Sequence, residues 1–324
     1  MTNNNKTNWP DQGQTYRHRL VERYVAYAEQ YKQPTAEAYN ALEERHVRLW
    51  EAVKTAYNLQ AWQPLRRLAW ALGVPTDGYL GVRGHWSDLQ QLLTWAIEAT
   101  RHLNEKYNEA AFIHCLAIVL QNTGDYEAAR QRYEQSLTIY ESLKNKAGMA
   151  SIYHELGRLA QATGDYETAR QRYEQSLTIK EELGNKVNMA SSYHQLGMLA
   201  QDTGDYETAR QRYEQNLTIF EELGNKAGMA NSYGQLAILA KDEGNLTEAE
   251  ALYQRALTMA EEMGDVVTAS IAMFNMGLLY EEQDRLAEAL PLLERAVAID
   301  KRVGRPQLEM SQKALARVRG KMEL

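Results

Sequence analysis

The chain has 324 residues, a formal net charge of −7 and one cysteine, and 44% of its residues are hydrophobic. A net acidic chain without a basic stripe is unsuited to phosphate backbones, so the charge excludes a general nucleic-acid binder. No run approaches the roughly eighteen apolar residues of a bilayer span, so we expect no membrane segment and no membrane partner. The cysteine, Cys115, lies in an apolar helical run, which predicts a buried, reduced thiol and a cytoplasmic protein.

The N-terminal section is built differently from the rest, because all six tryptophans precede residue 100. Residues 1–13 are polar and rich in Asn, which predicts disorder. Apolar spacing then predicts a helix from about Tyr16 to Tyr31 and a long helix over about 36–57. We therefore expect residues 14–60 to form a helical N-terminal cap or linker.

Residues 61–105 are expected to form a degenerate helix pair. Pro64 suits the first turn of a helix over 65–72. A Gly-rich loop of about a dozen residues follows, which is long for a helical array. A second helix then opens near His85 and runs to about Leu103.

Residues 107–306 contain five repeats of about forty residues, and two of them are nearly identical. Residues 147–186 and 187–226 differ at only eight of forty positions. Within the second copy, two apolar stripes at helical spacing flank the turn Thr203-Gly204-Asp205, which predicts two helices in each repeat. Such a period is typical of a stacked array. Residues 307–324 are expected to form a C-terminal capping helix and tail.

The repeat carries a resemblance to the tetratricopeptide repeat (TPR) family. The positions that carry it are Tyr193, Leu196, Gly197, Ala200, Gly204, Tyr206, Ala209 and Tyr213. The forty-residue length is similar to the long TPR variant of kinesin light chains and of many bacterial signalling proteins. The resemblance implies an all-α, right-handed TPR solenoid with helical caps at both ends. It also implies a non-catalytic protein that binds a protein or peptide partner.

A second resemblance covers about 36–306. The order of the N-terminal helices and the repeats resembles the C-terminal sensor half of bacterial STAND signalling NTPases. The residues concerned are Tyr39, Leu42, Glu43, Arg45, Trp62, Leu68, Leu72 and Arg83-Gly84-His85-Trp86. The segment Gly78 to His85 lacks the Gly-Lys-Ser/Thr ending of a phosphate-binding loop. The chain is therefore either a freestanding scaffold or the sensor module of a signalling or defence system, associated with a separate effector enzyme.

TPR ligands generally bind along a groove lined by the first helix of each repeat, so the resemblance implies candidate binding residues. They fall in three columns, and each column takes the equivalent position from successive repeats. The first column holds His114, His154, His194, Gly234 and Phe274, the second Gln121, Gln161, Gln201, Lys241 and Glu281, and the third Ile118, Arg158, Met198, Ile238 and Leu278. The histidines serve either as polar lining of a wet groove or as a ladder that contacts a peptide. Recurring one per repeat, they are too far apart to share one zinc ion, so we expect no metal site.

Three further patterns have two interpretations each. The two near-identical repeats differ in their first helices at Ile152/Ser192, Glu155/Gln195, Arg158/Met198 and Ala162/Asp202. These changes are either neutral drift on solvent-exposed positions or tuning of a groove. The second helices carry Glu–Arg pairs at i,i+3, such as Glu127–Arg130, which are either local ion pairs or a strip for an acidic partner. An apolar strip with Ile271, Phe274 and Leu278 is either a partner site or is covered by the closing helix, which we favour.

The sequence contains no catalytic constellation. Its Ser, His and Asp residues recur with the structural period and do not converge on one place. No Cys/His cluster has metal-ligand spacing, and no Gly-rich phosphate loop follows a strand. We therefore expect no enzyme activity and no cofactor.

Overall fold

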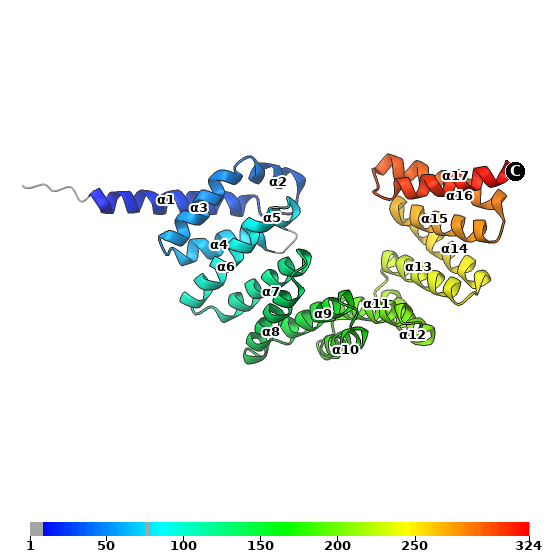
Figure 1. Ribbon diagram of the computed structural model, residues 1–324, viewed down its shortest axis with the longest axis horizontal. Helices are drawn as coiled ribbons and strands as arrows, with labels where there is room; N and C mark the ends of the chain where they lie inside the picture. The colour runs from blue at the N-terminus through cyan, green and yellow to red at the C-terminus, as the bar shows by residue number, and fades with distance from the viewer. Residues whose placement is uncertain (1–8, 75–77, 324) are drawn as a thin grey trace, which may run out of the picture. The chain divides into compact units, whose positions relative to one another are not determined.

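The computed structural model describes residues 9–74 and 78–323, and within these residues its regular secondary structure is entirely α-helical (Figure 1). Seventeen helices and no strand are present in this part of the chain. The predicted all-α repeat architecture is confirmed. The chain divides into two compact units, Met1–Gly164 and Asp165–Leu324, and the boundary falls in the turn between α9 and α10.

The first unit contains the N-terminal helices and the first regular helix pairs. Helix α1 packs against α3 and α4, and α4 packs against α6, which in turn packs against α7. Aromatic and aliphatic side chains, including Leu42, Val53 and Leu68, fill the core between them. The helices are α1 (Trp9–Gln30), α2 (Ala36–Glu43), α3 (His46–Asn58), α4 (Trp62–Gly73), α5 (Tyr79–Val82), α6 (Trp86–His102), α7 (Lys106–Asn122), α8 (Tyr126–Ser142) and α9 (Lys146–Ala162).

The second unit continues the repeats and ends on a single closing helix. Each helix packs against the next one along the chain, from α10 to α17. Ala314, Leu315 and Val318 of the closing helix join the core of the last pair. The helices are α10 (Tyr166–Glu182), α11 (Lys186–Asp202), α12 (Tyr206–Glu222), α13 (Lys226–Asp242), α14 (Leu246–Met263), α15 (Val266–Glu282), α16 (Leu286–Val303) and α17 (Leu308–Met322).

The turns inside each repeat explain why the helices start where they do. Gly204 takes a φ of +79°, which glycine adopts at little cost. The side chain of Asp205 accepts a hydrogen bond from the backbone N–H of Thr208 at 3.1 Å and caps α12. Asp125, Asp165 and Asn245 cap their second helices in the same way. The repeated Gly-Asp-Tyr sequence is thus a turn followed by an N-cap.

The two helices of a repeat approach each other closely at Gly197. A Cβ atom at this position would lie 2.6 Å from the ring of Tyr213 on the partner helix of the same repeat. Tyr213 is fully buried, and its hydroxyl reaches Gln201 at 2.8 Å. The tyrosine ring therefore fills the space that the missing side chain leaves, and α11 and α12 pack closely.

The N-terminal region differs from the sequence expectation in two places. The helix predicted over 36–57 is two helices, because Arg45 leaves the helical region with φ −116° and ψ 13°. Its guanidinium lies over the ring of Tyr27 at 4.4 Å, and the turn lets His46 start a new helix. The loop predicted after residue 72 contains the short helix α5, while residues 75–77 lie outside the described residues. Helix α1 begins at Trp9, so of the segment predicted to be disordered only residues 1–8 lie outside the described part.

Candidate functional site

The glutamine column of the predicted groove holds its own repeats together. Gln121 accepts a hydrogen bond from the hydroxyl of Tyr133 at 2.8 Å, and Gln201 accepts one from Tyr213 at the same distance. Gln201 also donates to Asp242 of the next repeat at 2.6 Å. Lys241, which holds the same column position one repeat later, forms an ion pair with Glu282 at 2.9 Å. These side chains tie helices together and remain half-buried at the surface.

The histidine column is also half-buried. The Nε2 of His114 is enclosed and finds no hydrogen-bond partner among the described residues. Burial lowers the pKa of His114 to about 4 and lowers the pKa of His194 as well. Both rings lie about 6 Å from the tyrosine of their own repeat, Tyr133 and Tyr213. His154 and Phe274 hold the equivalent places in α9 and α15 and are half-buried too.

The third column is mixed. Ile118, Met198 and Ile238 are half-buried, whereas Arg158 is exposed and donates to Glu155 at 3.0 Å. Together with the two columns above, these residues recur once per repeat on the first helices. Their role in binding stays a prediction.

The face on which the two near-identical repeats differ is only partly a solvent face. Ile152 and Ser192 are fully buried, so drift on exposed positions does not explain that pair. Ser192 accepts a hydrogen bond at 2.7 Å from Lys180, which is itself buried. The difference at residue 192 therefore belongs to a packing change between α10 and α11. A first helix buries two faces because it packs against both its partner helix and the neighbouring repeat.

The closing helix α17 leaves part of the apolar strip uncovered. It packs mainly against α16 and reaches α15 through Arg317 and Lys321, which both bind Glu281. Ile271 stays 41% exposed, while Phe274 and Leu278 are half-buried. Ile271 is therefore the member of the strip that is open to solvent.

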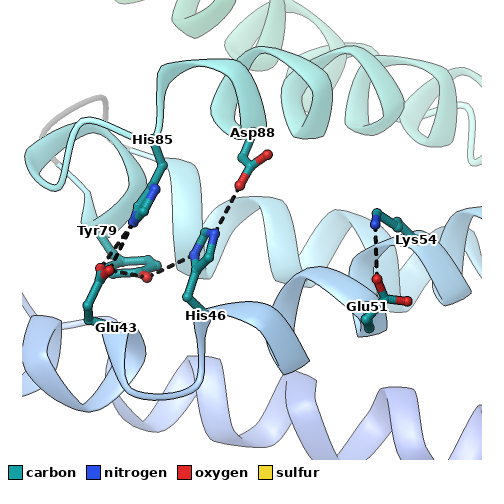
Figure 2. A network of polar contacts seen from close by, with 7 residues as sticks. All are labelled: Glu43, His46, Glu51, Lys54, Tyr79, His85 and Asp88. Carbon is teal, nitrogen blue, oxygen red and sulfur yellow. Dashed lines mark hydrogen bonds and ion pairs between the residues drawn. The ribbon is translucent and has the colours of Figure 1, made fainter.

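A second polar feature, which sequence reasoning did not find, joins α2 and α3 to α5 and α6 (Figure 2). We call Glu43, His46, Tyr79, His85 and Asp88 the polar cluster. The Nδ1 of His46 lies 3.0 Å from the hydroxyl of Tyr79, and its Nε2 lies 3.0 Å from Oδ2 of Asp88. Tyr79 donates to Glu43 at 3.0 Å, and the Nε2 of His85 lies 3.1 Å from the same carboxylate.

The hydrogen bonds of the cluster fit one arrangement of protons. The hydroxyl proton of Tyr79 goes to Glu43, so its oxygen accepts from Nδ1 of His46. Asp88 can only accept, so Nε2 of His46 also donates. The network is complete when both ring nitrogens of His46 carry protons.

Burial and hydrogen bonds shift the pKa values of two groups in the cluster, Tyr79 and Glu43. Burial, followed by the hydrogen bond to Glu43, raises the pKa of the fully buried Tyr79 above its ordinary range. Burial alone would raise the pKa of Glu43, but the hydrogen bonds from His85 and Tyr79 outweigh it and lower that pKa. Glu43 is thus held as an anion between two donors.

The cluster contains a set of metal-ligand types, but their geometry does not suit an ion. His46, His85 and Asp88 place ligand atoms within 4.8 Å of one another, the sole such group in the described part of the chain. However, the two imidazole rings are stacked, with centroids 4.0 Å apart and planes inclined by 13°. A metal lies close to the plane of each imidazole that binds it, and two nearly parallel planes do not meet at one ion. The arrangement is a hydrogen-bonded joint between helices.

The sequence held a partial signal for this joint. Glu43 and His85 belong to the residues that carry the STAND-like resemblance, but His46, Tyr79 and Asp88 were not singled out. Glu43 with His46, and His85 with Asp88, stand three residues apart at a helix end and a helix start. Such paired spacing is a usable sign of a shared polar site.

Comparison with known proteins agrees with this fold. A tetratricopeptide repeat model matches residues 108–182 and 188–262, and a second matches 235–302, so more than half of the chain is covered. No curated protein matches the chain. No helix in the described part of the chain combines the length and the apolar character that a membrane crossing requires.

Solved structures with similar folds come from several kinds of protein. BtubC from P. vanneervenii is 22% identical, with a TM-score of 0.61 over 68% of this chain and 92% of that one. A STAND protein with a tetratricopeptide repeat sensor from Pyrococcus horikoshii is 16% identical, with a TM-score of 0.64 over 92% of this chain. This chain spans about half of that protein (49%). A Rap protein complexed with competence and sporulation factor is 14% identical, with a TM-score of 0.53 over 96% and 99% of the two chains. The chain belongs to the tetratricopeptide repeat family.

Proposed function

We propose that this chain is a non-catalytic interaction scaffold that binds a peptide or protein segment along the first helices of its repeats. The observation that carries the proposal is the repeated set of half-buried side chains on these helices. Each repeat keeps its buried packing residues, such as Leu196 and Leu236, while the column positions change from His and Gln to Phe and Lys. A scaffold needs this combination of a constant frame and a variable surface.

The late part of the surface adds an apolar contact site. Ile271 is 41% exposed on α15, and Val267 one turn earlier is 40% exposed. Phe274 and Leu278 lie beside them and are half-buried. Apolar side chains gathered on an otherwise polar surface mark protein contact sites. The fold is shared with a Rap protein solved with a bound factor, which supports a peptide or protein ligand.

A second function has its own support. The STAND protein with a repeat sensor matches 92% of this chain. The polar cluster fixes α2 and α3 against α6, directly before the repeats. We propose as the alternative that the chain is the sensor module of a cytoplasmic bacterial signalling or defence system and controls a separate effector. The buried thiol of Cys115, whose pKa burial raises to about 12, suits a reducing compartment.

The scaffold proposal is tested by quantitative capture of partners from the source cell. The protein is used as wild type, as H154A/H194A and as T138A/T178A. Thr138 and Thr178 are exposed on second helices and each bonds only a carbonyl of its own helix, so they provide the matched control. We expect one or more partners to be reduced by the histidine variant and retained by the threonine variant. Equal recovery of every partner by all three proteins would remove the histidines from the site.

The same capture separates the two functions. If the chain is a sensor module, its partners include a nuclease, protease or NTPase whose rate changes when the purified chain is added. If it is a scaffold alone, the captured partners keep their rates. Far-UV circular dichroism of each variant confirms that the helices are intact.

A further inference from the structure

A cavity of about 450 Å³ lies between α10, α11 and α12 and shares no residue with the predicted columns. Leu196, Leu199 and Ala200 of α11 form its apolar part. Arg170 of α10 and Arg212 of α12 also line it. A volume in this range accommodates a side chain and its neighbours from a bound peptide.

The next repeat shows what the same place holds when it is closed. Arg210 stands forty residues after Arg170 and reaches across to the following repeat. It donates to Glu248 at 2.7 Å and also binds Glu243. Two carboxylates of the protein itself therefore occupy the position beside this arginine.

At the cavity these two carboxylates are missing from the sequence. The residues forty positions before Glu243 and Glu248 are Thr203 and Thr208, and both line the cavity. The hydroxyl of Thr203 bonds the carbonyls of Leu199 and Ala200, so it does not face Arg170 as an ion would. Arg170 instead turns back to Glu167 in its own helix, at 2.7 Å. The side chains of Arg170 and Glu167 are both more than half exposed, so their ion pair is weak. Arg170 can therefore exchange Glu167 for another carboxylate.

We propose that this cavity binds an acidic side chain of a partner segment, flanked by apolar residues. The carboxylate takes the place that Glu243 and Glu248 hold at the next junction and binds Arg170. The apolar neighbours contact Leu196 and Leu199. Three carboxylates, those of Glu167, Glu174 and Asp205, also line the cavity and favour a cation, so a basic probe is the necessary comparison. This binding site is independent of the proposed groove function. Its residues differ from those of the columns, and its test requires no captured partner.

The experiment is an NMR titration of the full chain, following the Nε–Hε resonance of Arg170, which the R170K variant assigns. The probes are three capped tripeptides: Leu-Glu-Leu, Leu-Gln-Leu and Leu-Lys-Leu. We expect the Glu peptide to shift the resonance until the site is saturated. The Gln and Lys peptides should bind with an affinity lower by about fivefold or more, as a charge-assisted hydrogen bond requires. A flat titration, or equal or tighter binding of either comparison peptide, would overturn the proposal.

Two charge-matched variants complete the test. T203E/T208E introduces the two glutamates of the next junction and is expected to lower the affinity for the Glu peptide by about tenfold or more. It should also move the Arg170 resonance without any peptide. T178E/T218E adds the same charges to exposed positions of α10 and α12 outside the cavity and should bind within about twofold of wild type. If T203E/T208E binds as wild type does, Arg170 is not the site, and R170Q checks this without adding any charge.

Discussion

Replacing Gly228 with alanine is expected to weaken the junction between α12 and α13, whereas the same change at Gly234 should stabilise the helix α13 itself. A Cβ atom at Gly228 would lie 2.4 Å from two ring atoms of Phe220 on the preceding helix. At Gly234, in the same helix, nothing lies within 4 Å of the new atom. The two substitutions are chemically identical, so they differ only in what the added methyl group meets.

The magnitudes follow from these surroundings. At Gly234 alanine replaces glycine in a helix interior and should gain about 0.5–1 kcal/mol. At Gly228 the contact involves the root of the Phe220 ring as well as its edge, so the whole ring must move. Such overpacking typically costs about 1–3 kcal/mol. The two variants should therefore differ by at least about 1.5 kcal/mol, which is large for a single methyl group.

Urea unfolding followed by far-UV circular dichroism measures the difference, and hydrogen exchange of α12 and α13 locates it. The double variant F220L/G228A tests the cause, because a smaller side chain at residue 220 should recover part of the loss. The chain offers a parallel one repeat earlier, where Lys180 replaces the aromatic residue and Asn188 replaces the glycine. Equal unfolding midpoints for G228A and G234A would contradict the close contact between the Phe220 ring and Gly228.

Three further predictions concern the core, the C-terminal end and the polar cluster. Leu196→Ala should cost about 2–5 kcal/mol in urea unfolding, because the side chain is buried. Glu281 has a pKa lowered to about 2, chiefly by the hydrogen bond from Arg317, although burial opposes the shift. Since the folded pKa lies below the unfolded one, this stability is complete above about pH 5 and is lost as the pH falls towards 2, by about 1–3 kcal/mol in an acid titration. In E281Q that pH dependence should be absent. Tyr79→Phe removes the hydroxyl between Glu43 and His46 and should cost about 1–3 kcal/mol, and an unchanged unfolding midpoint would show that the cluster contributes nothing.

The regular helix pairs could be predicted from the sequence because the same caps and stripes recur in register. Gly204 and Asp205 mark a turn and a cap, and the structure places both as expected. The break after Glu43 could not be predicted, because apolar residues continue at helical spacing on both sides of it. It depends on Arg45 lying over Tyr27, which belongs to a different helix.

The polar cluster could not be predicted from the sequence either, because its contacts join residues that are far apart in the chain. His46 lies 33 residues from Tyr79 and 42 from Asp88, and Tyr79 belongs to α5, a short helix within a Gly-rich segment that predicts a loop. The burial of Ser192 was missed because one apolar stripe was used to define the packed side of the first helix. A first helix in a stack packs on two sides, and its second side carries polar residues that are bonded, as Lys180 and Ser192 are.

The most direct test of the scaffold proposal is hydrogen exchange of the purified chain with and without a partner obtained by capture. The account predicts new protection on the first helices α11, α13 and α15, with Met198, Ile238 and Phe274 inside the protected peptides. Weak additional protection around Arg170 would agree with the acidic-side-chain cavity. Protection confined to the second helices α12, α14 and α16, with the first helices unchanged, would contradict the proposal that the partner lies along the first helices.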